Sequence, residues 1–210
     1  MRLGTGICLV PQRNPVYTAK SISDVDWLSG GRVDFGVGVG WLAEEFGALD
    51  VPWEGRGSRC REYVEVMRSL WEDDVSSHKG ELYELPASRQ YPKPVQKPHP
   101  PIHFGGESDA ALRRVADVGQ GWYGFSLEPE AVPERLAFLT RLLEERGRRR
   151  DDVLVSICPY LLGADAAKVE RYLEAGVDQV ILPAFAFDVD GIRSLLDSYA
   201  ATIVEPAAAL

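Results

Sequence analysis

The feature that most constrains the fold of this chain is a regular alternation of short apolar runs and amphipathic segments in its second half. Apolar runs occur at 102–104, 122–125, 153–162 and 179–183. The segments that follow them, at 108–118, 129–146, 164–175 and 189–203, carry apolar residues at helical spacing. Strands and helices that alternate in this way predict a parallel sheet with right-handed crossovers.

The first half begins with the same pattern. Residues 3–10 form an apolar run that predicts one buried strand, and residues 33–40 predict a second strand. Asn14 and Pro15 are typical of the N-cap and first position of a helix, which Gly30–Gly31 would end. The expected apolar side of this helix comprises Val16, Ala19, Ile22, Val25 and Leu28.

Two more helices are expected before the pattern changes, one starting near Trp41 and a strongly amphipathic one over 56–71. The change comes around 74–101, where alternating short pieces predict a hairpin over 76–91. Five prolines between 92 and 101 then predict an extended connector. We expect this stretch to be an excursion inserted into a single domain that covers 1–210.

The number of strand–helix units defines the fold class. We count six, whereas a closed barrel of parallel strands needs eight, typically in ~250 residues. The prediction is therefore an α/β fold, an incomplete TIM-type (β/α) barrel with the first two units missing. Because a six-stranded parallel sheet has two open edges, either a partner chain covers these edges or the chain is a truncated gene product.

Composition and charge exclude several classes of function. The chain is 45% hydrophobic and 26% charged, as ordinary globular proteins are. A net charge of -9 disfavours general nucleic-acid binding, and no apolar run approaches the ~20 residues that span a bilayer. The cysteines Cys8, Cys60 and Cys158 are few and widely spaced, which favours reduced thiols and a cytoplasmic location.

The turn Gly105–Gly106–Glu107–Ser108 is the most informative candidate site. Two glycines end a predicted strand and a helix begins at once. Such a turn directs free backbone N–H groups and the positive helix end at one point, where an anion can approach closely. Arg113 and Arg114 would add positive charge further along the helix. The alternative is a tight strand-to-helix turn without a ligand.

Glycines also alternate along the predicted strand at 36–40. Gly-rich strands allow another backbone to pack closely, and this is one interpretation. As a dinucleotide-binding fingerprint the run fits only the looser form that ends in Ala43. A third interpretation is that glycines at a strand end let a flat ring lie against the backbone.

The three histidines show no metal-ligand spacing, and no metal site is expected. His78 and His99 lie in predicted loops, whereas His103 lies in a strand two residues before the glycine turn. His103 is therefore a candidate for contact with a ligand, against the alternative of an ordinary hydrogen-bonded histidine. No serine or cysteine lies in a nucleophile motif, and no P-loop is present.

Several motifs occur in an order that is typical of a known family. They are Arg2-Leu3-Gly4-Thr5-Gly6, Asn14-Pro15, Leu28-Ser29-Gly30-Gly31-Arg32, Gly36-Val37-Gly38-Val39-Gly40-Trp41, the segment 56–62, Lys93-Pro94-Val95-Gln96 and Gly105-Gly106-Glu107-Ser108-Asp109-Ala110-Ala111. In these motifs the chain resembles the bacterial luciferase-like monooxygenase family, and within it the branch of coenzyme F420-dependent (deazaflavin) oxidoreductases. The resemblance is specific from residue 2 to about 118 and looser beyond.

The resemblance implies a TIM barrel with a cofactor at the carboxyl ends of its strands. It places the cofactor ring over Gly6–Ile7, where the family has a strand bulge with a non-proline cis peptide bond. The cofactor-binding residues it implies are Thr5, Gly6, Ile7, Val39, Gly40 and Trp41, with Gly105, Gly106, Glu107 and Ser108 at the phosphate. Family members carry two further strand–helix units before Arg2. His103 and Glu44 are candidates for a catalytic acid or base, and neither role is assigned.

Three functional hypotheses follow from the resemblance. The first is hydride transfer between reduced coenzyme F420 and an unknown small organic substrate. The second is an FMN-dependent monooxygenase that uses a separate flavin reductase. The third is a non-catalytic, truncated flavin-binding remnant. For each we expect a homodimer without nucleic-acid or membrane partners, and for the active forms a flavin or F420 reductase as a possible partner.

Overall fold

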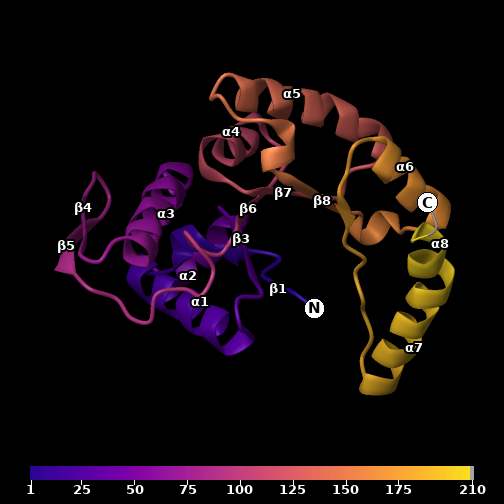
Figure 1. Ribbon diagram of the computed structural model, residues 1–210, viewed down its shortest axis with the longest axis horizontal. Helices are drawn as coiled ribbons and strands as arrows, with labels where there is room; N and C mark the ends of the chain where they lie inside the picture. Colours follow the sequence, from indigo (N-terminus) through magenta and orange to yellow (C-terminus); the bar gives the residue numbers. More distant parts are fainter. Residues whose placement is uncertain (209–210) are drawn as a thin grey trace. The chain divides into compact units, whose positions relative to one another are not determined.

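The computed structural model of the protein describes residues 1–208 (Figure 1). The chain divides into two compact units, Met1–Gly105 and Gly106–Leu210. Each unit alternates parallel strands with helices, as the sequence predicts. The expectation of one domain over 1–210 stays a prediction. Within the described residues, no helix is both long and apolar enough to cross a membrane.

The first unit contains four elements of parallel sheet, three α-helices and a hairpin. Its elements are β1 (Leu3–Gly4), β2 (Cys8–Leu9), the 3₁₀ helix η1 (Val10–Gln12), α1 (Pro15–Ser29), β3 (Val33–Gly38), α2 (Ala43–Ala48), α3 (Arg56–Glu72), β4 (Ser76–Lys79), β5 (Glu84–Ser88) and β6 (Ile102–Gly105). The central strand β3 pairs with β1 and β2 on one side and with β6 on the other, always in parallel.

The predicted strand over 3–10 is wrong in two respects. It is interrupted between Gly4 and Cys8, and its two short parts are not buried, since Leu3 is 38% exposed. Both parts pair only with β3 in the described chain, with Leu3 opposite Val33 and Cys8 opposite Val37. The spacing of apolar residues predicts a strand but cannot show that the strand is interrupted.

Helix α1 begins as predicted, but it buries another face. The Asn14 side chain accepts hydrogen bonds from two backbone N–H groups of the first turn, and Gly30 ends the helix with φ +68°. Val25 and Leu28 are 42% and 88% exposed, so the predicted apolar side is wrong at its C-terminal end. The buried residues include Ala19, whose carbonyl accepts a hydrogen bond from the Trp71 indole of α3. Packing on α3 therefore sets the rotation of α1.

The buried core of the first unit lies between β3 and the helices. Phe35 of β3 packs edge-on against Trp71 of α3, with 6.0 Å between the ring centroids. Both rings are 1% exposed or less, as are Val64, Met67 and Leu70 of α3. These three residues form part of the apolar face predicted from the sequence, which confirms the helix over 56–71 as a core element.

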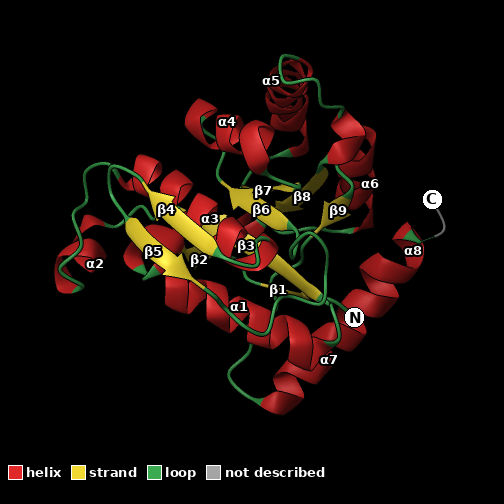
Figure 2. Cartoon of the chain, turned by 60° about the vertical axis from the view of Figure 1, so that its left-hand side comes forward, coloured by secondary structure: helices red, strands yellow, loops and turns green. Residues whose placement is uncertain are grey.

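The hairpin of β4 and β5 forms where the sequence predicts one (Figure 2). It is joined to α3 through the carboxylate of Glu62. This carboxylate accepts hydrogen bonds from the backbone N–H groups of Leu82 and Tyr83, at 3.0 and 2.7 Å, and lies 3.3 Å from His78 Nε2. One side chain on α3 thus fixes the tip of the hairpin.

The second unit repeats the strand–helix pattern three times. Its elements are α4 (Asp109–Val118), β7 (Gly121–Phe125), η2 (Pro129–Ala131), α5 (Val132–Glu144), η3 (Arg150–Asp152), β8 (Leu154–Cys158), η4 (Tyr160–Leu162), α6 (Ala166–Glu174), β9 (Gln179–Val180), α7 (Val189–Tyr199), the π-helix η5 (Ala200–Val204) and α8 (Glu205–Ala207). Strands β7, β8 and β9 pair in parallel, with β8 between the other two.

Two of the predicted elements in this unit extend too far. The strand expected over 153–162 stops at Cys158, because Pro159 follows and Tyr160 adopts φ +53°. The strand expected over 179–183 is limited to Gln179–Val180. Apolar residues beyond a strand end look the same in sequence as those within it, and here they lie in the loops that follow β8 and β9.

Candidate cofactor site

In the break between β1 and β2, the backbone lies in close contact with a glycine of β3. The Gly6–Ile7 peptide bond is cis, as the family resemblance implies. The Thr5 hydroxyl donates a hydrogen bond to the Gly36 carbonyl at 2.8 Å. A Cβ atom placed on Gly36 would lie 1.9 Å from the Thr5 carbonyl oxygen, which no side chain can tolerate. Gly36 is therefore required by the approach of the Thr5 backbone.

The Ile7 side chain lies against two more glycines. A Cβ atom on Gly38 would lie 2.0 Å from Ile7 Cδ1, and one on Gly105 would lie 2.7 Å from the same atom. The glycine pattern of β3 is thus explained by close packing, which was one of the interpretations drawn from the sequence. It places Thr5, Ile7 and Gly105 together at the carboxyl ends of parallel strands, where α/β folds bind ligands.

The residues that follow β3 lie near the same end of the unit. Val39 is half-buried and Trp41 is 83% exposed. Gly40 has φ +81°, and a Cβ atom there would lie 2.8 Å from the Phe46 ring. Glu44 is exposed in the first turn of α2. The structure gives Glu44 no buried environment that would prepare it for proton transfer.

An open cavity of about 520 Å³ adjoins the Gly6–Ile7 bond. Its lining combines the apolar residues Ile7, Leu9 and Leu49 with the polar side chains of Gln12, Arg13, Asn14, Tyr17, Thr18 and Ser21. Sequence reasoning missed Gln12 and Arg13 as possible ligand contacts. The only available signal was their position directly after a strand end.

The turn after β6 has the positive φ and the helix start expected of an anion site, but the Gly106 N–H is not free, since it donates to the Tyr123 carbonyl at 3.2 Å. Gly106 has φ +112°, a conformation that side-chain-bearing residues rarely adopt. Ser108 is the N-cap of α4, and its hydroxyl accepts a hydrogen bond from Ala111 N at 3.2 Å. Helix α4 spans ten residues and starts at Asp109, so its first-turn N–H groups follow the glycines at once.

The Glu107 side chain is hydrogen-bonded to the backbone at the end of β7. Its carboxylate accepts a hydrogen bond from Phe125 N at 2.6 Å. Burial is the main influence on this carboxyl and raises its pKa, against the lowering effect of hydrogen bonds from Phe125 N–H and from its own N–H.

The two arginines of α4 that were expected to add charge to this turn lie in different surroundings. Arg113 lies 5.7 Å from the centre of the Phe138 ring, and Arg114 is only 8% exposed. A third arginine, Arg135 of α5, carries its positive charge to the start of α4, where it forms an ion pair with Asp109 at 2.7 Å. This pair offsets the acidic residue at the first position of α4. An anion at this turn would have the backbone N–H groups at the start of α4 as donors.

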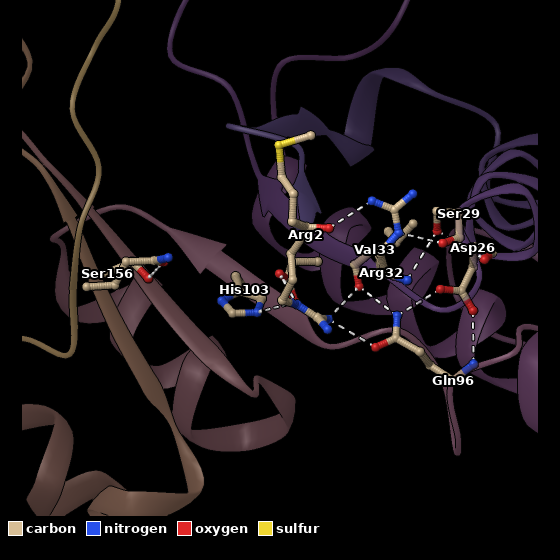
Figure 3. Close-up of polar contacts among 11 residues, drawn as sticks. Arg2, Asp26, Ser29, Arg32, Val33, Gln96, His103 and Ser156 are labelled. Carbon is tan, nitrogen blue, oxygen red and sulfur yellow. Dashed lines mark hydrogen bonds and ion pairs between the residues drawn. The ribbon is translucent and has the colours of Figure 1, made fainter. Parts of the chain in front are cut away.

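His103 is buried in a polar network of the first unit (Figure 3). Within residues 1–208, its Nε2 atom has no hydrogen-bond partner. It lies 3.6 Å from Asp34, which binds Arg2 through two hydrogen bonds of 2.6 and 2.7 Å. Burial lowers the pKa of His103, although the Asp34 carboxylate acts in the opposite direction. A neutral imidazole is therefore favoured.

The network continues from Arg2 to the Pro-rich connector. Arg2 donates to the Gln96 side chain, which in turn donates to the fully buried carboxylate of Asp26 at 2.8 Å. Sequence reasoning identified His103 but missed Asp26, Asp34 and Gln96. Their role depends on contacts between α1, β3 and the connector, which are remote in sequence. Among the described residues, no group of His, Cys, Asp and Glu side chains is arranged to hold a metal ion.

Comparison with known proteins identifies the family of this chain. The sequence profile of the luciferase-like monooxygenases matches residues 1–205. The chain belongs to the luciferase-like monooxygenase family. The motifs at 2–6, 36–41 and 105–111, which carried the resemblance to this family, lie within the matched residues. The family's enzymes are oxidoreductases, including monooxygenases.

Two curated proteins illustrate the relationship. An uncharacterised protein of Mycobacterium tuberculosis is 33% identical over 182 residues, which cover 86% of this chain and 63% of that protein. The FMNH2-dependent dimethylsulfone monooxygenase of Pseudomonas putida is 35% identical over 113 residues, covering 52% of this luciferase-like chain and 31% of the enzyme. The chain thus spans less than two thirds of these relatives.

A solved structure supports the fold. The coenzyme F420-dependent tetrahydromethanopterin reductase of Methanopyrus kandleri matches 98% of this chain and 83% of its own, with a TM-score of 0.82 and 17% identity. This likeness confirms an incomplete TIM-type (β/α) barrel as the fold of this luciferase-like chain.

Proposed function

We propose that this chain is an oxidoreductase that uses coenzyme F420 to exchange a hydride with a small organic substrate. The observation that carries the proposal is the Gly106 turn, which combines φ +112° with the start of a ten-residue helix. Membership of the luciferase-like family gives the reaction class. The Methanopyrus kandleri enzyme, which depends on F420, has the same fold and favours this cofactor.

The residues of the chain fit such a cofactor in two places. At Gly106 the backbone needs a glycine, and the N–H groups at the start of α4 suit a phosphate. At Gly6–Ile7, the cis peptide bond would back a planar ring, as the family resemblance implies. Thr5, Val39, Gly40 and Trp41 would line the ring, and Gly105, Glu107 and Ser108 would complete the phosphate turn.

In this proposal the protein acts by positioning. The bound deazaflavin would supply the hydride chemistry. The chain holds the Thr5–Ile7 backbone in place through the Thr5–Gly36 hydrogen bond and the contacts of Ile7 with Gly38 and Gly105. His103 and Glu44 receive no assignment as acid or base, since His103 is confined by Asp34 and Glu44 is exposed.

A second candidate is an FMN-dependent monooxygenase that receives reduced flavin from a separate reductase. It is favoured by the 35% identity to the FMNH2-dependent dimethylsulfone monooxygenase. Both cofactors carry a phosphate, so the Gly106 turn suits either. The third candidate, a non-catalytic flavin-binding remnant, would bind cofactor without turnover. For each candidate we also propose a homodimer in the cytoplasm.

Titration of the purified chain with oxidised coenzyme F420 and with FMN tests the proposal. Quenching or polarisation of the fluorescence of each cofactor gives its Kd. Tight binding of F420 with weak binding of FMN supports the first candidate. Tight binding of FMN alone supports the second. Failure to bind either cofactor refutes both.

A further inference from the structure

Three aromatic side chains gather beyond the strand ends of the second unit. The Phe125 and Tyr160 rings lie 4.8 Å apart with an angle of 37° between their planes, and the Phe185 ring lies 6.0 Å from Tyr160, nearly perpendicular to it. We call Phe125, Tyr160 and Phe185 the ring cluster. Phe125 is 43% exposed and Phe185 is 67% exposed. Aromatic faces left in water at such spacing offer a surface for another ring.

The backbone holds two of these rings by unusual conformations. Ser126, directly after Phe125, has φ +55°, and Tyr160 itself has φ +53°. Residues other than glycine rarely adopt this region, and such outliers concentrate at functional sites. Ser126 N donates a hydrogen bond to the Cys158 carbonyl at 2.8 Å, which couples the ends of β7 and β8. The cluster is therefore built into the strand ends.

The ring cluster is connected to the proposed phosphate turn within the same unit. Phe125 N–H is the donor to the Glu107 carboxylate, at 2.6 Å. The turn and the cluster thus share one hydrogen bond at the carboxyl ends of parallel strands, where ligands bind in this class of fold.

Strand alternation shows which face of the sheet carries the cluster. Trp122 is fully buried and donates to the Gly106 carbonyl, so the next residues on the other face are Tyr123 and Phe125. Burial, together with a hydrogen bond to Cys158, raises the pKa of the Tyr123 phenol. Tyr123 therefore remains a neutral hydroxyl, and it lies on the same face of the strand as Phe125, two residues away.

We propose that the ring cluster binds the planar, ring-bearing part of the organic substrate, whose oxygen substituent would reach the Tyr123 hydroxyl. This inference rests on the proposed function and specifies its substrate class as aromatic or conjugated alcohols and carbonyl compounds. A rigid ring gains from stacking without losing conformational freedom on binding, whereas a flexible chain gains only apolar burial.

Equilibrium dialysis with two probes tests the inference on the full chain without cofactor. The probes are 2-naphthol and its saturated analogue decahydro-2-naphthol, which share a carbon skeleton and a hydroxyl. The wild-type chain should bind 2-naphthol more tightly. Phe185→Ala should weaken 2-naphthol binding by about three- to tenfold, the value of one aromatic pair. Phe187→Ala is the matched control, since Phe187 is fully exposed in the same loop and outside the cluster.

Tyr160→Gly provides a second variant, because it removes a ring while relieving the positive φ. Equal binding of 2-naphthol by the wild type, Phe185→Ala and Tyr160→Gly would overturn the substrate site. That result would not affect the cofactor proposal, which titration with F420 and FMN tests separately. Ring-dependent 2-naphthol binding by a chain that takes neither cofactor would remove the redox function instead.

Discussion

At the scale of single residues, a few glycines define the candidate cofactor contacts in each of the two units. Gly36, Gly38 and Gly105 make room for the Thr5–Ile7 backbone and side chains, and Gly106 provides the positive φ of the turn. The sequence predicted these positions as glycine motifs. It could not say whether Gly36 and Gly38 serve packing or ligand contact, because that depends on how closely the segment between β1 and β2 approaches β3.

Substitution of Gly36 tests the packing explanation. Gly36→Ala should lower the free energy of unfolding by about 1–3 kcal/mol, the usual cost of overpacking, since its Cβ would collide with the Thr5 carbonyl. Gly47→Ala is the control, because nothing lies within 4 Å of its Cβ and alanine favours the α2 helix. Urea denaturation measures both. Equal stability of the two variants would refute close packing at Gly36.

The charge of Glu107 is predicted to oppose binding of an anionic cofactor. Glu107→Gln keeps an acceptor for Phe125 N–H but removes the charge, so the affinity for F420 or FMN should rise by roughly two- to tenfold. Glu107→Leu, which loses the acceptor as well, should not show this gain. Fluorescence titration compares the variants. A weaker affinity of Glu107→Gln would mean that the carboxylate contributes directly to the site.

At the scale of elements, caps and helical spacing were predictable, whereas strand ends and helix rotation were not. Asn14 and Gly30 cap their helix as the sequence indicates, because capping depends on adjacent residues. Leu28 is exposed although helical spacing predicted it on the apolar side, so the rotation of α1 was not predictable. The face that α1 buries is selected by α3, which lies more than twenty residues further along the chain.

The hairpin offers a test of one contact between elements. Glu62→Ala should lower the free energy of unfolding by about 1–3 kcal/mol, since two backbone N–H groups of the hairpin lose a charged acceptor. Hydrogen exchange at Leu82 and Tyr83 should accelerate. Glu65→Ala, an exposed position on the same helix, is the control. Unchanged exchange at both amides would show that the hairpin is held by other contacts.

At the scale of the whole molecule, the fold class was predictable and the internal divisions were not. The alternation of strands and helices predicted the incomplete barrel that the Methanopyrus kandleri structure supports. The periodicity of apolar residues predicts helices and strands but not which of them pack together. The division into two compact units was therefore not predictable. The polar network of Asp26, Asp34 and Gln96 was also missed, because its members are distant in sequence.

Stability should depend on pH through two buried histidines. Burial is the main cause that lowers the pKa of both His99 and His103 from the ordinary value of 6.5. Below pH 6.5 the unfolded chain takes up protons that the folded chain does not bind, so the free energy of unfolding falls with the pH. Urea denaturation between pH 7.5 and 5.5 should show this loss. The double variant His99→Gln/His103→Gln should lose less over the same range, and an equal loss would contradict the assignment.

The central claim is that the backbone turn at Gly106 binds the cofactor phosphate. The most direct measurement is the affinity of Gly106→Asp for coenzyme F420 and FMN, compared with the wild type and with Gly147→Asp. Gly147 also has a positive φ and nothing within 4 Å of its Cβ, so it controls for adding an aspartate to the second unit away from the turn. We predict that Gly106→Asp loses measurable binding while Gly147→Asp retains it. Unchanged affinity of Gly106→Asp would contradict the claim.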